Sequence, residues 1–243
     1  MHRRAFSLLE LAIVLGISGL MVGYMVDTAR SIDRARNGDC IANTQSTLRE
    51  IRGSVERFAR SHDRLPLPAA RNVGTDSPIF GRETSGANID VAGGVSFGAV
   101  PFQALEISPS YAGDCYGNKF SYMVTTALTT NASSGGYLDS TIEGNIALKN
   151  AAGTTTNAKI AYAIISHGVD GLGAVKLNYS AVNAADGPPD TAHRWCSGAT
   201  LKEKNCLATA ATVTVADSNT GKDAAAAYFD DMVGTSINSR HRF

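Results

Sequence analysis

The first thirty residues separate into a short basic start and a long apolar run. Residues 6–26 carry one charged side chain, that of Glu10, and Arg3 and Arg4 precede them. A helix of about 20 apolar residues crosses a bilayer's hydrocarbon core, which is roughly 30 Å thick. The pattern therefore predicts one membrane-spanning helix over residues 6–26, and the basic start favours a cytoplasmic N-terminus.

Beyond Val26 the continuous apolar run gives way to a helical stripe. Mostly apolar residues recur every three or four positions, with arginines and glutamates between them. The stripe consists of Ile41, Thr44, Leu48, Ile51, Val55, Phe58 and His62. The residue before a proline disfavours helix, and the first proline is Pro66. We therefore expect an amphipathic stem helix over residues 27–62 that continues the apolar helix.

Residues 63–243 have the pattern of a separate head. Residues 66–98 are rich in glycine and polar side chains and predict a loop, and residues 100–105 could start a short helix. Alternating or continuous apolar runs predict strands at 119–125, 159–166 and 211–215, and a strand or short helix within 225–237. One long helix followed by strands predicts an α+β fold, with the helix packed on an antiparallel sheet.

The charge balance argues against a nucleic-acid partner. The 243 residues include 22 Lys and Arg against 22 Asp and Glu, and only 7% are aromatic. Proteins that bind nucleic acids usually carry a basic patch or stripe. Outside the extreme N-terminus no basic cluster stands out, so no nucleic-acid partner is evident.

Two features distinguish the N-terminal segment from an ordinary secretory signal. Such a signal has a shorter apolar core and a small-residue cleavage site, whereas residues 27–30 read Asp-Thr-Ala-Arg. A carboxylate such as Glu10 costs about 2.5 to 3.5 kcal/mol at the bilayer centre, and less near the interface. Glu10 is therefore a functional candidate; the alternative is a shallow carboxylate solvated by headgroups.

Residues 4–15 read Arg-Ala-Phe-Ser-Leu-Leu-Glu-Leu-Ala-Ile-Val-Leu. This string resembles the class III signal of type IV pilins and type II secretion pseudopilins. In that family a prepilin peptidase cuts before a Phe, the new amine is methylated, and a Glu lies four residues further on. The resemblance implies a leader of residues 1–5, cleavage between Ala5 and Phe6, and N-methylation of Phe6. Ala5 departs from the Gly usual before the cut.

The resemblance gives Glu10 a role in assembly. An amine on Phe6 inside an apolar helix bundle is costly unless it meets an opposite charge. Glu10 of a neighbouring subunit would supply that charge, so the pair would set the register of the assembly rather than add net stability.

Two further sequence segments, residues 114–122 and 165–174, are similar to turns in pseudopilin heads. In major pseudopilins the second loop helps to bind calcium. The resemblance matches Asp170 to the acidic residue of that loop and leaves Asp186 and Asp190 as further ligands at a longer spacing. Calcium takes six to eight oxygen ligands. The alternative is an Asp-Gly turn without metal, and no other cofactor is indicated.

Four cysteines in an oxidising compartment allow three disulfide connectivities. Cys196 and Cys206 are separated by nine residues, which makes them the favoured pair, worth about 3 kcal/mol. Cys40 with Cys115 follows only as the remainder, and buried free thiols are the alternative.

No arrangement of residues makes a convincing active site. Ser166 and His167 are adjacent at the end of a predicted strand, so they point to opposite faces and cannot act as nucleophile and base. The set of His193, Cys196, Cys206 and His241 matches no familiar zinc spacing. The glycines at 168–173 precede no helical pattern. We expect a protein that is not an enzyme.

Together these patterns predict a prepilin-like structural subunit, by family analogy a minor one, of a type IV pilus or related fibre. Its expected partners are the prepilin peptidase, other pilin or pseudopilin subunits and inner-membrane assembly machinery. It would cross the inner membrane once with its head in the periplasm. A type II secretion pseudopilin is the first alternative, and a periplasmic enzyme or binding protein on an uncleaved anchor is the second.

Overall fold

A computed structural model describes residues 8–85, 89–131, 142–150, 152, 154–168, 174–177, 212–214 and 232–237. The chain divides into two compact units, residues 1–43 and residues 44–243. Each unit is considered separately below.

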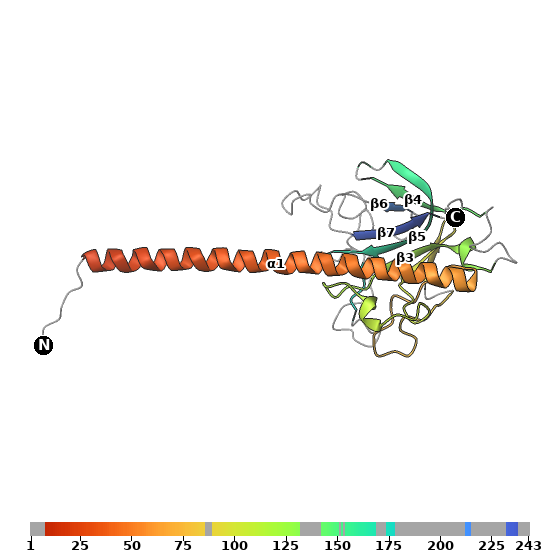
Figure 1. The fold of residues 1–243 in the computed structure, drawn as a ribbon, viewed down its shortest axis with the longest axis horizontal. Coiled ribbons are helices and arrows are strands. Elements are labelled where there is room, and N and C mark those ends of the chain that lie inside the picture. Colours follow the sequence, from red (N-terminus) through yellow and green to blue (C-terminus); the bar gives the residue numbers. More distant parts are fainter. Residues whose placement is uncertain are drawn as a thin grey trace. The chain divides into compact units, whose positions relative to one another are not determined.

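One long helix runs through both ranges. Helix α1 spans Leu8–His62, 55 residues without a break (Figure 1). The predicted continuity and the predicted end near residue 62 are confirmed. The helix stops where Asp63 takes a positive φ of 53°, the left-handed conformation that commonly ends a helix, although glycine is the usual residue there.

The strands form a single, mostly antiparallel sheet. They are β1 (Asp90–Ala92), β2 (Val95–Ala99), β3 (Ser121–Thr125), β4 (Ile146–Lys149), β5 (Thr155–Ser166), β6 (Thr212–Thr214) and β7 (Met232–Ile237). The strand order is β1-β2-β3-β5-β4-β6, and β7 also pairs with β5. Among the described strands, only β4 and β6 pair in parallel, which departs from the antiparallel sheet expected. The fold is α+β.

Strand β5 is the centre of the sheet and pairs with three other strands. Its second half runs antiparallel to β3 and to β7, with Tyr162 opposite Val124 of β3 and Ser236 of β7. Its first half pairs with β4, and Figure 1 shows β7 beside β5. Three of the other six described strands thus pair with one 12-residue segment.

The two faces of the sheet bury different side chains, as the two-residue period of a strand requires. On one face Tyr122, Val124, Tyr162 and Ile164 pack with the stem part of α1 in one apolar cluster. The helix contributes Leu48, Ile51, Val55, Phe58 and Ala59. A second cluster contains Phe97, Met123, Ile160, Ala163 and Ile165. The predicted stripe is therefore buried from Thr44 to Phe58, whereas Ile41 is half-buried and His62 is exposed.

Two expectations about the head were wrong, and one strand was missed. The segment 66–98, expected as loop, contains β1 and the start of β2, joined by Gly93 and Gly94 with φ of 56° and 74°. Strand β4 was not expected. Residues 100–105 form turns and no helix, because Glu106 at φ 55° closes the single turn, with the Ile107 amide donating to the Phe102 carbonyl at 3.1 Å.

Candidate functional site

The N-terminal part of α1 exposes its apolar residues on all sides. Every side chain described between Ala12 and Ile32 is exposed, including Leu20 at 78% and Tyr24 at 75%. Monomeric soluble proteins rarely expose contiguous apolar surface on this scale. By length and composition α1 contains a segment able to span a membrane, which agrees with the membrane helix expected from the sequence.

Of the residues predicted for processing and assembly, the structure describes the backbone of Glu10 and not Ala5 or Phe6. Glu10 is in the first turn of α1, but its side chain, like Ala5 and Phe6, lies outside the described residues. An added Cβ at Gly16, Gly19 or Gly23 would meet nothing within 4 Å. Each of these glycines therefore leaves open space beside the helix.

Among the residues that the structure describes, one disulfide is formed, and it is the pair that the sequence favoured less. Cys40 of α1 and Cys115 are bonded to each other. The Thr44 hydroxyl lies 3.3 Å from the Cys115 sulfur. The favoured pair, Cys196 and Cys206, lies outside the described residues, as do Asp170, Asp186 and Asp190. Among the residues described, no group of three or more His, Cys, Asp or Glu side chains could hold a metal ion.

The segments 114–122 and 165–174 are joined by one buried network of hydrogen bonds. Asp114 accepts hydrogen bonds from the amides of Tyr116 at 3.0 Å and Asn118 at 2.9 Å, which closes the turn around Gly117. The second carboxylate oxygen accepts the Ser166 hydroxyl at 2.8 Å. The turn at 114–118 is thereby fixed to the end of β5.

Asn118 adds a second hydrogen bond between the same two segments. Its amide nitrogen donates to the Gly168 carbonyl at 3.1 Å, and its amide oxygen accepts the Lys176 ammonium at 2.8 Å. Asn118 is 1% exposed. A buried amide whose donor and acceptor are both engaged stabilises one arrangement of the loop and disfavours alternatives.

His167 has a different partner from the one considered in the sequence. Its Nε2 lies 2.7 Å from the Ser121 hydroxyl, whereas Ser166 binds Asp114. The expectation that Ser166 and His167 do not form a pair therefore agrees with the structure. Ser121 and His167 are buried, so a substrate could not reach the Ser121 oxygen in this conformation.

Lys119 is a buried cation that the sequence did not single out. The side chain is 2% exposed, and its ammonium donates to the carbonyls of Arg71 at 2.8 Å and Val73 at 2.6 Å. It also lies 5.4 Å from the centre of the Phe80 ring. Burial lowers the pKa of Lys119 to about 8, because a low-dielectric surrounding disfavours the charged form.

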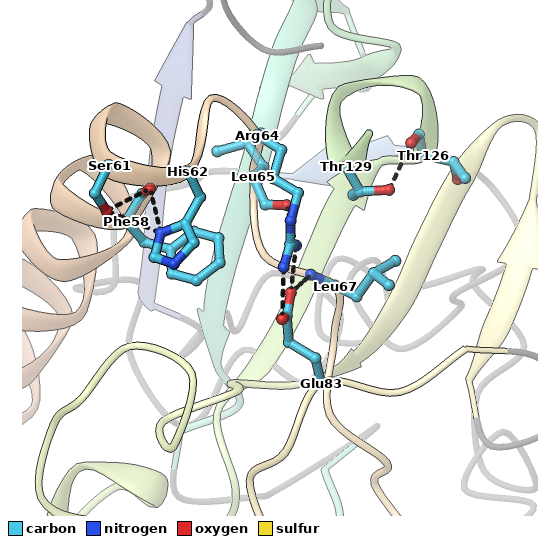
Figure 2. A network of polar contacts seen from close by, with 9 residues as sticks. All are labelled: Phe58, Ser61, His62, Arg64, Leu65, Leu67, Glu83, Thr126 and Thr129. Atoms are coloured by element: carbon cyan, nitrogen blue, oxygen red, sulfur yellow. Dashed lines mark hydrogen bonds and ion pairs between the residues drawn. The ribbon is translucent and has the colours of Figure 1, made fainter. Parts of the chain in front are cut away.

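A second network holds the end of the stem (Figure 2). Arg64 makes a two-pronged ion pair with Glu83, at 2.6 Å and 2.9 Å, and Glu83 also accepts the Leu67 amide at 2.6 Å. The hydrogen bond to Glu83 raises the pKa of Arg64. The Leu65 amide donates to Leu128 at 2.8 Å. Local sequence could not reveal this pair, because 18 residues separate its two members.

Searches against protein-family models, curated proteins and solved structures found no match to this chain.

Proposed function

We propose that this chain is a prepilin-like structural subunit, in a minor position, of a type IV pilus or related fibre. The observation that carries the proposal is the division of α1: an exposed apolar part over Ala12–Ile32, then a part whose apolar stripe packs on the sheet. The first part suits lipid or the core of a helix bundle. The second part presents the head, residues 63–243.

The proposal assigns the N-terminal residues to processing and assembly. The prepilin peptidase would cut between Ala5 and Phe6, the amine of Phe6 would be methylated, and Glu10 would neutralise that amine on a neighbouring subunit. Before assembly the chain would cross the inner membrane once, with its head in the periplasm. The fibre subunits and the inner-membrane assembly machinery are then its partners.

The intact mass of membrane-extracted protein tests the processing step. We expect a mass lower by residues 1–5 and higher by one methyl group. A mature protein that begins at Met1, or beyond Ala29, would contradict the proposal. A start at Met1 would favour a periplasmic enzyme or binding protein held by an uncleaved anchor.

Fibre incorporation tests the assembly step. In sheared surface fractions, or in cross-linked periplasmic fibres for a secretion system, we expect Glu10→Ala to remove the subunit while its level in the membrane stays unchanged. Asp27→Ala is the matched control, because Asp27 is an exposed acidic residue of the same helix, and it should be incorporated normally. Equal incorporation of both variants would exclude the proposed role of Glu10.

A further inference from the structure

The loop formed by residues 70–80, here the 70–80 loop, is fixed at both ends. Ala69 exchanges two backbone hydrogen bonds with Ala99, at 2.9 Å and 2.8 Å, and bridges to Glu83. Glu83 in turn holds Arg64 (Figure 2). At the other end Gly81 has a φ of 73°, and an added Cβ there would lie 2.2 Å from the Phe102 ring. The loop therefore begins and ends at defined points.

Between these points the 70–80 loop rests on one cation and two aromatic rings. The Lys119 ammonium binds the carbonyls of Arg71 and Val73. The Arg71 guanidinium stacks 4.5 Å from the centre of the Phe97 ring, and Phe80 packs edge-on against Phe102 at 4.8 Å. Gln103 adds one hydrogen bond from its side chain to the Phe80 carbonyl at 2.6 Å.

No carboxylate balances the Lys119 charge among the residues that the structure describes. The charged groups on the neighbouring segments are Arg71 and the exposed Asp76 of the loop, Asp114 of the 114–118 turn, and Lys176 beside that turn. The Asp114 carboxylate is engaged by Ser166 and by two amides, and Lys176 by Asn118. Among the described residues, the Lys119 ammonium contacts two carbonyl groups and the Phe80 ring, and a buried charge without a counter-charge is costly.

We propose that the 70–80 loop is a flap that opens locally about Ala69 and Gly81, and that its opening returns the Lys119 ammonium to water. Both carbonyls that hold the ammonium belong to the flap, so one movement frees the cation and uncovers the rings of Phe97 and Phe102. The Arg64–Glu83 pair lies outside the flap and keeps its base in place. Opening therefore leaves the sheet intact.

The flap takes up a proton when it opens. In the closed form the pKa of Lys119 is about 8, whereas a solvated lysine has its ordinary value near 10.4. The closed form thus binds fewer protons above pH 8, and proton linkage makes opening easier at low pH. Between pH 7 and pH 9 the opening equilibrium constant should fall about tenfold.

Hydrogen exchange of the full chain in detergent micelles tests this inference, with rates corrected for the intrinsic effect of pH. The amides of Ser77 and Phe80 report on the flap, since they donate to Gly74 and to Ser77 within it, and isolated turns protect amides weakly once released. The β5 amides of Ala161–Ile165 report on global unfolding. We expect the flap amides to exchange faster than those of β5, and about tenfold more slowly at pH 9 than at pH 7.

Two variants separate the role of Lys119 from other effects of pH. Lys119→Met removes the titrating group and should abolish the tenfold change. Lys159→Met is the matched control, because Lys159 is an exposed sheet lysine, and it should keep the change. If Lys119→Met does not fold, Lys119→Arg serves instead, because a guanidinium stays charged throughout this range. Flap amides that exchange only with β5, or a pH effect that persists in the Lys119 variant, would overturn the proposal.

Discussion

The Ser166 hydroxyl donates a hydrogen bond of 2.8 Å to the Asp114 carboxylate, across 51 intervening residues. Both side chains are buried. The bond joins the turn that leads into β3 to the end of β5, two strands that are neighbours in the sheet. One carboxylate thereby fixes a turn and the place where two strands meet.

Replacing Asp114 should lower the stability of the head more than replacing an exposed acidic residue. Asp114→Ala leaves the amides of Tyr116 and Asn118 and the hydroxyl of Ser166 without their acceptor, and each such loss costs about 1 to 3 kcal/mol. We expect a loss of at least about 2 kcal/mol in the free energy of unfolding, measured by urea denaturation. Asp76→Ala, at an exposed position, should change it by less than about 0.5 kcal/mol. Equal effects would show that the Asp114 network contributes little.

The Arg64–Glu83 pair should matter more than an exposed ion pair of similar geometry. Glu83→Ala leaves a half-buried guanidinium and the Leu67 amide without partners, which should cost about 2 kcal/mol. Lys159 and Glu143 form the matched exposed pair, with side chains 61% and 58% exposed, and Glu143→Ala should cost less than about 1 kcal/mol. Thermal unfolding of both variants in the same buffer gives the comparison, and a reversed order would contradict it.

Loss of the Cys40–Cys115 disulfide should destabilise the protein strongly. The bond encloses 74 residues, and a loop of that size corresponds to about 4 kcal/mol of lost unfolded-state entropy. Cys40→Ser with Cys115→Ser should therefore lower the urea midpoint well below that of the wild type. Peptide mapping without reduction should recover the linked pair. Recovery of Cys115 linked to Cys196 or Cys206 would refute the pairing.

Glycine should be better than glutamate at position 106. Glu106 has a φ of 55°, and the left-handed region costs a residue with a Cβ about 1 to 2 kcal/mol. Glycine removes that cost but loses about 0.5 to 1 kcal/mol through the greater freedom of the unfolded chain. Glu106→Gly should therefore raise the free energy of unfolding by up to about 1 kcal/mol. Glu106→Ala, which keeps the Cβ, is the control and should not.

Lys119 should make global stability rise with pH in the alkaline range. Its pKa is lowered to about 8 in the folded protein, so the folded state binds fewer protons than the unfolded state above that value, and stability increases up to the unfolded pKa near 10.4. Between pH 7 and pH 9 we expect the wild type to gain about 1.4 kcal/mol relative to Lys119→Met. A constant difference between the two proteins over this range would contradict the assignment.

The sequence predicted the elements whose periodicity is long or unbroken. The apolar run and the stripe from Ile41 to His62 predicted α1, and the runs around Tyr122 and Tyr162 predicted β3 and β5. Strand β2 was missed because Gly98 and Ser96 weaken its pattern. An added Cβ at Gly98 would lie 2.4 Å from the Ala69 carbonyl, so this glycine is required by a distant segment. The Gly93–Gly94 dipeptide was the available signal for the hairpin.

The polar sites were less predictable, because their partners are far apart along the chain. The sequence segments around Asp114 and Ser166 each stood out on their own, but no rule of sequence spacing predicts that the two side chains form a hydrogen bond. The short spacing between Cys196 and Cys206 favoured that pair, since short loops close easily. Cys40 and Cys115 are far apart in the sequence, and only the fold of the chain brings them together. Lys119 occupies a polar position in the alternating pattern of residues 119–125, where an exposed lysine is expected. The sequence does not show that its side chain is buried.

The position of β7 affects how the head is made. Strand β7 pairs with β5 along Ile160–Ser166, about 70 residues earlier in the chain, so this stretch of β5 lacks its β7 partner until residues 232–237 have been synthesised. Pairing between such distant segments is slow, and an unpaired strand edge is prone to aggregation. In a nascent chain, this edge of β5 therefore stays open to other strands until residues 232–237 have emerged from the ribosome.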